Sequence, residues 1–365
     1  MWNRKLFTYL IFSFIAYTAA GQPGKSPELE LMHNNARQHV KMGNIDAAIT
    51  TYKQLLALDA ADTRVATELG NVLYIKSDYE QAIAVLAPLT DRTDASDTVY
   101  QLLASSQAAL HHSKKAHETL NAGITRFPHS GLLFYELGTL HYNEGSELNA
   151  TKAWQNGIVA APYFAPNYKS IASSFMTSNQ PQWGLICGEQ YLLMVHDTIG
   201  DELFKKSLYK CWKDFFDKIT VLSDGNTTGE MIGIFKQLTP VVSDGISVEN
   251  LTMVRTRFLM EWMKTVVQVD NQTGRRQDIS THSYTPGLFT DQELLIREGL
   301  FDIYNEWLFG RAESKAAFEA WNKFHPDAID KFEKWRAANP FDPTGLRFIP
   351  GEQILETTFS KKKKR

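Results

Sequence analysis

The chain of 365 residues contains little cysteine and little excess charge of either sign. Its two cysteines, Cys187 and Cys211, lie neither in a CxxC pair nor beside other metal ligands, so no zinc site is predicted. They could form a disulfide in an oxidising compartment or stay unpaired inside the protein. The net charge of −3 argues against a nucleic-acid partner, because proteins that bind nucleic acids usually carry a basic surface.

Long apolar segments are also scarce, and the one that stands out lies near the N-terminus. Residues 6–20 are apolar, follow a short basic start and end in small residues before Gly21. This is the pattern of a cleaved signal peptide over residues 1–20. At about 15 residues the stretch is short for a membrane anchor, which needs about 20. No cysteine follows it, so we expect an exported protein, periplasmic or secreted, that is not a lipoprotein and keeps no integral membrane segment.

Common catalytic motifs are missing. The sequence has no GxSxG, HExxH, GxGxxG or phosphate-binding GxxxxGK motif. His111 and His112 are adjacent but have no carboxylate or cysteine at metal-ligand spacing, so we expect exposed turn residues there. His282, near Asp291 and Arg297, is a minimal acid/base group whose geometry the sequence leaves open. We therefore predict no catalytic residue, no cofactor and no metal.

Small side chains, by contrast, recur at a fixed 34-residue interval through the first half of the chain. Two series keep this interval, and the second runs twelve positions behind the first: Ala36, Gly70, Ala104, Gly138 and Ala172, then Ala48, Ala82, Ala116, Ala150 and Gly184. A 34-residue unit is typical of helix–turn–helix repeats that stack into a solenoid. Because paired helices lie only about 8–10 Å apart, their closest crossing needs small side chains. We expect Gly70 to face Ala82 in this way.

Further residues recur at fixed places in the units. The second unit carries Leu69, Gly70, Tyr74, Ala82 and Leu86, and the fourth carries Leu137, Gly138, Tyr142, Ala150, Trp154 and Pro162. This pattern resembles the tetratricopeptide repeat family. The resemblance implies an all-α, right-handed helix–turn–helix solenoid of five units: 29–62, 63–96, 97–130, 131–164 and 165–198. The fifth unit has Gly188 where an aromatic is expected, so we predict an irregular second helix there.

Beyond the fifth unit the interval is lost, but helical periodicity continues. We expect an irregular helical domain over residues 201–340 that covers the end of the array, because stacked repeats need a terminal cap. Within it we expect one helix over 247–269, an exposed loop, and another helix over 290–310 that opens with a capping box. Its many aromatic residues are more typical of a core than of a ligand site. Residues 341–365 are predicted to be an irregular tail with a basic end.

In tetratricopeptide repeat proteins the first helices of the units line a concave groove, so the resemblance implies a partner-binding face there. The expected groove residues are His33, Arg37, Lys41, Asn71, Tyr74, Ser105, Tyr135, Thr139, Tyr142, Asn143 and Lys169. Tyrosine and arginine dominate binding hot spots, which favours a protein or peptide ligand. Tyr74 and Tyr142 could instead pack within their own hairpins.

The sequence therefore favours an exported scaffold or adaptor, not an enzyme, that binds a protein or peptide in the groove of its repeats. The alternative is an enzyme or carbohydrate-handling protein whose active part is residues 201–350, with the repeats as a docking platform. Neither the identity of the partner nor the oligomeric state follows from the sequence.

Overall fold

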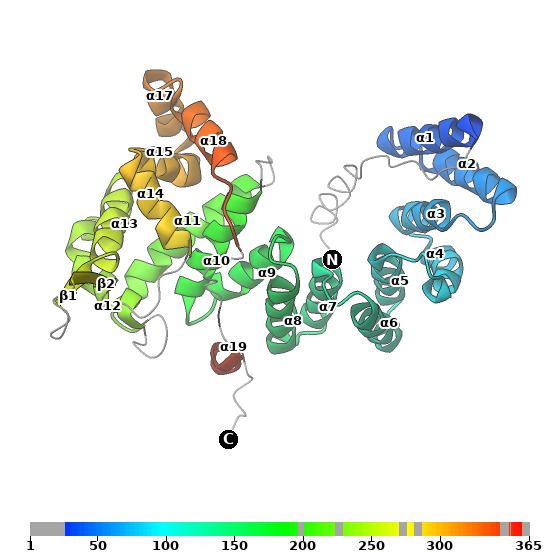
Figure 1. The fold of residues 1–365 in the computed structure, drawn as a ribbon, viewed down its shortest axis with the longest axis horizontal. Helices are drawn as coiled ribbons and strands as arrows, with labels where there is room; N and C mark the ends of the chain where they lie inside the picture. Colours follow the sequence, from blue (N-terminus) through cyan, green and yellow to red (C-terminus); the bar gives the residue numbers. More distant parts are fainter. Residues whose placement is uncertain are drawn as a thin grey trace. The chain divides into compact units, whose positions relative to one another are not determined.

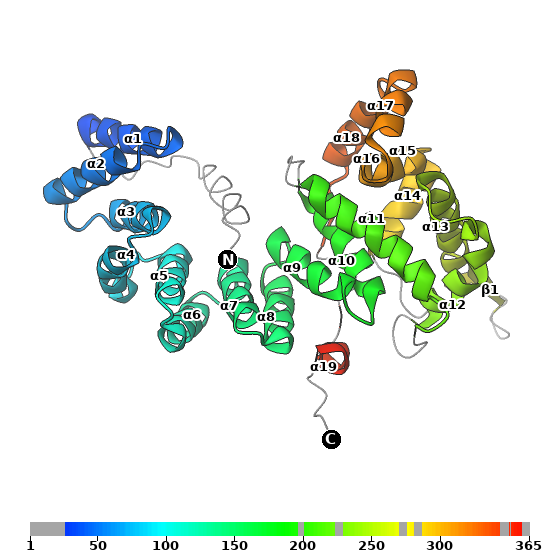
Figure 2. The same ribbon diagram turned by 180° about the vertical axis from the view of Figure 1, so that it is seen from behind.

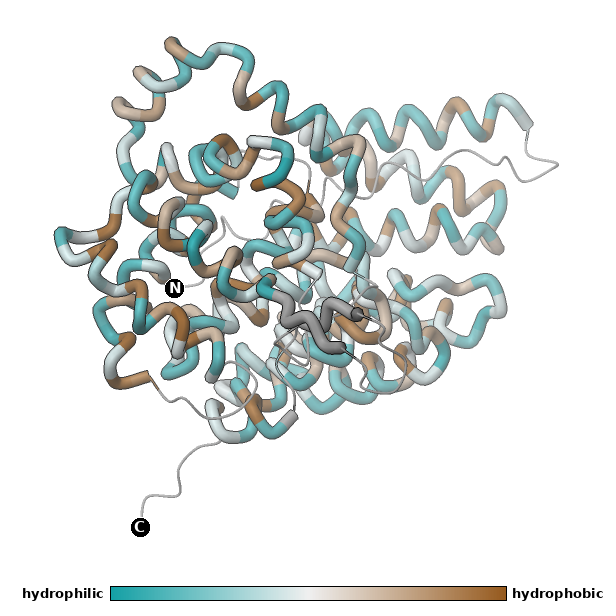
Figure 3. The backbone as a smooth tube through the Cα atoms, turned by 60° about the vertical axis from the view of Figure 1, so that its left-hand side comes forward, coloured by the Kyte–Doolittle hydropathy of each residue, from teal (hydrophilic) through white to brown (hydrophobic). Residues whose placement is uncertain are grey.

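The computed structural model describes residues 26–195, 201–222, 229–269, 276–280, 287–343, 350 and 352–359. The chain divides into two compact units, one up to Glu144 and one from Gly145 onward. The predicted signal peptide, His282 and the basic end of the chain lie outside the described residues. Hydrophobic and hydrophilic residues alternate along the helices (Figure 3), and no described helix is long and apolar enough to cross a membrane.

The first unit is built from helices that follow one another as hairpins (Figure 1). They are α1 (Pro27–Lys41), α2 (Ile45–Leu58), α3 (Thr63–Lys76), α4 (Tyr79–Leu86) with the 3-10 turn η2 (Ala87–Asp91), α5 (Asp97–Ala109), α6 (Ser113–Arg126) and α7 (Gly131–Asn143). The starts of α3, α5 and α7 keep the 34-residue interval of the sequence. The predicted helix–turn–helix architecture is confirmed.

Within the first unit the two helices of each repeat lie on different sides of a curved stack. Figure 1 and Figure 2 show α1, α3, α5 and α7 along the inner side of the curve, with α2, α4 and α6 along the outer side. The first helices therefore form one continuous inner face.

The turn between the two helices of each repeat has a fixed backbone geometry. Gly43, Ser77, His111 and Gly145 follow one another at the repeat interval and have φ angles of 77°, 69°, 61° and 76°. In the first three turns, the next amide N–H donates to the carbonyl five residues earlier, at 2.8–2.9 Å. This is the usual cap of a helix that ends at a left-handed residue. The repeats therefore share not only their helices but also the φ angle of the residue at the turn between them.

All ten recurring small residues are buried. A Cβ atom on Gly70 would lie 2.5 Å from the side chain of Leu86. On Gly184 it would lie 2.7 Å from the backbone nitrogen of Met176. Such distances are too short for carbon contacts, so these two positions need glycine because a neighbouring helix occupies the space.

The second unit continues with repeat helices and then becomes irregular. Its elements are α8 (Glu147–Ala160), α9 (Ala165–Met176), α10 (Pro181–Met194), α11 (Asp201–Lys218), α12 (Gly229–Leu238), the 3-10 turn η3 (Thr239–Val242), α13 (Val248–Trp262), β1 (Thr265–Val269), β2 (Arg276–Ser280), α14 (Gly287–Arg297), α15 (Phe301–Asn305), the π-helical turn η4 (Glu306–Gly310), α16 (Arg311–Glu313), α17 (Lys315–Phe324), α18 (Ala328–Ala338) and α19 (Glu352–Phe359). Strands β1 and β2 pair antiparallel, from Thr265 opposite Ser280 to Val269 opposite Arg276.

Two helix predictions in this unit are wrong. The helix expected over 247–269 ends at Trp262, and its last residues form β1, whose β-branched sequence favours a strand. The helix expected over 290–310 begins at Gly287, so Thr290 lies inside it rather than capping it. The chain also turns at Gly299, with a φ of 64°, before α15 begins.

The prediction of an irregular second helix in the fifth repeat is also wrong. Every residue of α10 except Met194 is buried, because α9, α11 and α14 pack around it. A Cβ atom on Gly188 would lie 2.7 Å from Leu208 of α11, which fills the place expected for an aromatic. This packing joins the last repeat to the helices that follow. One compact unit ends at Glu144 and the other begins at Gly145, so the fifth repeat lies in the same unit as the helices that follow it.

The C-terminal segment contains order that the sequence did not predict. Helix α19 lies within the expected irregular tail and packs on α8. Its Leu355 is fully buried, Glu356 pairs with Lys152 at 2.9 Å, and the ring of Phe359 lies 4.9 Å from that of Phe175. Apolar side chains on one side of this helix explain its attachment.

Candidate functional site

On the inner face of the first unit, the Glu68 carboxylate is already paired with side chains of the protein itself. Glu68 on α3 lies 2.8 Å from His33 Nε2 and accepts hydrogen bonds from Arg37 Nε at 3.1 Å and from the Tyr52 hydroxyl at 2.8 Å. Burial alone would raise the pKa of Glu68, but hydrogen bonds from His33 and Arg37 outweigh it and lower this pKa to about 2. Glu68 is therefore ionised and already paired.

Glu136 on α7 occupies the same repeat position two units later. It accepts hydrogen bonds from Gln101 Nε2 at 3.0 Å and Ser105 Oγ at 3.3 Å. These neutral donors hold the repeat positions that the two basic donors of Glu68 hold. Burial raises the pKa of Glu136 to about 7, although both hydrogen bonds oppose the shift. Within the described part of the chain, no basic side chain lies at ion-pair distance from Glu136.

Two half-buried tyrosines flank this carboxylate. Burial, and after it the charge of Glu136, raises the pKa of Tyr135 to about 12 and also raises the pKa of Tyr74. The ring of Tyr74 lies 5.5 Å from that of Tyr79 on α4, so Tyr74 packs within its own hairpin. We use the name Glu136 patch for the set Tyr74, Gln101, Ser105, Tyr135 and Glu136.

The other predicted groove residues lie in different surroundings. His33 is buried against Glu68, so its side chain is not offered to a ligand, and Arg37 is half exposed but paired with Glu68. Lys41, Tyr142 and Asn143 are exposed, whereas Asn71 and Thr139 are half-buried.

Lys169 belongs to the second unit and is bound there. Its Nζ lies 3.4 Å from Asp201 and donates a hydrogen bond to the Tyr191 hydroxyl at 3.1 Å. Glu136 and Gln101 were absent from the predicted set, although the 34-residue register with Glu68 and His33 points to them.

The histidine groups weighed in the sequence do not form a site among the described residues. His111 and His112 are exposed in the turn before α6. Arg297 is exposed and pairs with Glu293 on its own helix. Burial, with the charge of Asp342 in second place, raises the pKa of Asp291 to about 6, but its proposed partner His282 lies outside the described residues.

The second unit contains a buried charged cluster around Glu189 on α10. Its carboxylate accepts hydrogen bonds from Arg255, from Gln292 at 2.7 Å and from Tyr304 at 2.9 Å, and Arg255 also donates to Asn305. The adjoining cavity has a volume of about 20 Å³, room for about one water molecule. The cluster therefore links α10, α13, α14 and α15 and leaves no space there for a substrate.

Cys187 and Cys211 are both buried and form no disulfide with each other in this structure. Burial raises the pKa of the Cys187 thiol, and it also raises the pKa of Cys211 to about 12. Thiols of this kind stay protonated and unreactive at neutral pH.

A curved stack of 34-residue helix hairpins defines a helical-repeat protein. Residues 39–106 match the family model described as tetratricopeptide repeat, the same family that the sequence pattern resembles.

Three similar solved structures are 16–21% identical to this chain over the parts that align, and no curated protein matches it. The crystal structure of MamA is 21% identical and covers 44% of this chain and 93% of its own, with a TM-score of 0.36. TTC0263, a tetratricopeptide repeat protein of Thermus thermophilus, is 16% identical over 46% and 91%, with a TM-score of 0.40. YrrB, described as having an unusual peptide-binding site, is 16% identical over 45% and 84%, with a TM-score of 0.33.

Proposed function

We propose that the protein is an exported scaffold that binds a protein or peptide segment on the inner face of its first unit. In this proposal a lysine or arginine side chain of the partner pairs with Glu136. The observation that carries it is the difference between Glu68 and Glu136. Both hold the same repeat position, but among the described residues only Glu68 has basic partners.

A basic side chain would supply the missing partner charge. A half-buried carboxylate with only neutral donors keeps a raised pKa, and an approaching cation favours its ionised form. Tyr135 beside it offers a rigid, amphipathic contact of the kind that dominates binding hot spots. Arg37 attracts an acidic partner less strongly than Glu136 attracts a basic one, because Glu68 already neutralises the Arg37 charge.

A display library of random peptides, selected against the full chain, tests this proposal. Selected peptides are expected to share a lysine or arginine, and to bind Glu136→Gln at least tenfold more weakly, since charge-assisted hydrogen bonds are worth about 1.5–3 kcal/mol. The matched control is Glu118→Gln, which removes an exposed glutamate from α6 on the outer side. Selected peptides rich in Asp and Glu, or equal affinity for Glu136→Gln, would contradict the proposal.

Export rests on the N-terminal sequence pattern alone. Mass spectrometry of the protein recovered from its native host is expected to find an N-terminus at Gly21. An intact Met1 on the abundant form would contradict export by a cleaved signal peptide.

A further inference from the structure

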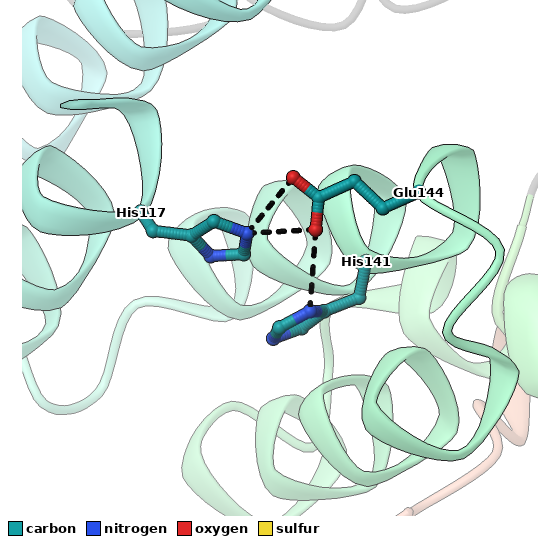
Figure 4. A group of neighbouring side chains, drawn as sticks. All are labelled: His117, His141 and Glu144. Atoms are coloured by element: carbon teal, nitrogen blue, oxygen red, sulfur yellow. Dashed lines mark hydrogen bonds and ion pairs between the residues drawn. The ribbon is translucent and has the colours of Figure 1, made fainter. Parts of the chain in front are cut away.

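Two histidines and a glutamate meet where α6 and α7 pack together (Figure 4). His117 comes from the second turn of α6, whereas His141 and Glu144 lie at the C-terminal end of α7. A nitrogen of each ring points toward the Glu144 carboxylate. The three side chains are 23–32% exposed, so small ions and water can reach them.

The distances between the three groups are compatible with a shared metal ion. His117 Nε2 is hydrogen-bonded to Glu144 Oε2 at 2.9 Å and to Oε1 at 3.1 Å, whereas His141 Nδ1 lies 3.9 Å from Oε2, too far for a hydrogen bond. Ligand atoms held at about 2.0–2.1 Å around a tetrahedral zinc ion are about 3.3–3.4 Å apart. The two distances to Glu144 Oε2 bracket that value, and all three ligand atoms lie within 4.8 Å of one another.

The ligand types and the position at the end of α7 also suit a metal ion. Neutral imidazole and carboxylate are the ligand forms of these residues. The end of α7 carries the negative partial charge of a helix C-terminus, which stabilises a nearby cation.

We propose that His117, His141 and Glu144 bind a divalent transition-metal ion, with Zn²⁺ as the probe. Imidazole nitrogens select such ions over Mg²⁺ and Ca²⁺, which prefer oxygen ligands. Two histidines and one glutamate leave a fourth position for water. A bound ion would clamp the third repeat, which contributes α6, to the fourth, which contributes α7.

The test is a zinc titration of the metal-free full chain by isothermal calorimetry. We expect one ion per chain at this site and a higher melting temperature with zinc present. His117→Ala and His141→Ala are each expected to weaken this binding at least tenfold. The matched controls His112→Ala and His129→Ala remove exposed histidines elsewhere and should leave it unchanged.

A second measurement needs no variant and therefore holds even if a substitution disturbs folding. Zinc should slow hydrogen exchange at the imidazole carbons of His117 and His141 in the wild-type chain, but not at those of His112 and His129. Unchanged exchange at the first pair, or equal zinc affinity in all four alanine variants, would overturn the proposal.

Discussion

At the scale of single residues, the 34-residue interval repeats chemical roles as well as side-chain sizes. Glu68 and Glu136 hold one repeat position, and donors from the preceding first helix bind each of them. One set of donors is basic and the other neutral, so one carboxylate has a pKa of about 2 and the other of about 7. The same fold therefore provides one closed ion pair and one carboxylate that has no cationic partner among the described residues.

The left-handed turn residues lead to a first prediction. Ser77→Gly and His111→Gly should each raise the free energy of unfolding by about 0.5–1 kcal/mol, because glycine tolerates positive φ without steric cost. Gly43→Ser, at the equivalent position, should lower it by a similar amount. Urea unfolding of the three variants measures these changes. A loss of stability in both glycine variants would contradict this account of the turns.

Glu136 leads to a second prediction, about pH. Its folded-state pKa is raised above the unfolded value, so the folded chain binds more protons between about pH 4.5 and 7. Stability should therefore fall as pH rises through this window, by on the order of 3 kcal/mol in total.

Glu136→Gln keeps the shape of the protonated side chain and should remove this part of the pH dependence. Urea unfolding of the wild-type chain and of Glu136→Gln is compared at pH 5, 6, 7 and 8. Other titrating groups, such as Asp291, contribute equally to the pH dependence of stability in both chains. Curves that stay parallel from pH 5 to 8 would contradict the raised pKa.

The repeat positions could be predicted from the sequence, whereas contacts between residues far apart in the sequence could not. Small residues recur because paired helices lie at a fixed distance from each other. The 34-residue period of these residues is therefore enough to predict the helix pairs. The neutral surroundings of Glu136 become visible only once Gln101 and Ser105 are placed beside it. Likewise, His117 and His141 belong to different helices, and only the packing of α6 on α7 brings them together.

At the scale of elements, packing by the second unit explains where the sequence predictions failed. Helix α10 is buried on nearly all sides, so its sequence lacks the two-sided pattern of a surface helix. Helix α19 is short, and a helix of eight residues is not stable in water without tertiary contacts. Its existence therefore depends on α8, which a local reading of the sequence does not include.

The contact of α19 gives a third prediction. Leu355→Asp would place a charge against α8 at a fully buried position, so α19 should detach. Amide hydrogen exchange over 352–359 should then approach that of an unfolded peptide. Gln353→Asp, on the exposed side of the same helix, should leave the exchange slow. Slow exchange in both variants would show that this contact does not hold the helix.

At the scale of the whole molecule, two compact units depend on different interactions. The first unit is a stack in which each repeat contacts its neighbours, and apolar and small residues fill its core. The second unit is held around the buried pair of Glu189 and Arg255, which joins helices far apart in the sequence. Arg336 adds to it by donating to the carbonyls of Leu192 and Val195 at the end of α10.

This difference gives a fourth prediction. Arg255→Met leaves the buried Glu189 carboxylate without its cation and should cost about 3–5 kcal/mol of stability. The double variant with Glu189→Met should cost less than the sum of the single changes. Lys334→Met, which breaks the exposed pair with Asp330, should cost less than about 1 kcal/mol. Chemical unfolding checks all four chains, and strictly additive costs would contradict the role of the pair.

Site-specific photocrosslinking in the native host tests the central claim most directly, namely that the inner face of the first unit holds the partner. A photoreactive phenylalanine derivative replaces Asn71 or Tyr142 on inner helices, and Lys114 or Glu118 on the outer helix α6. We predict one shared crosslinked product from the two inner positions and none from the two outer positions. The same product from Lys114 and Glu118, with none from Asn71 and Tyr142, would contradict the account.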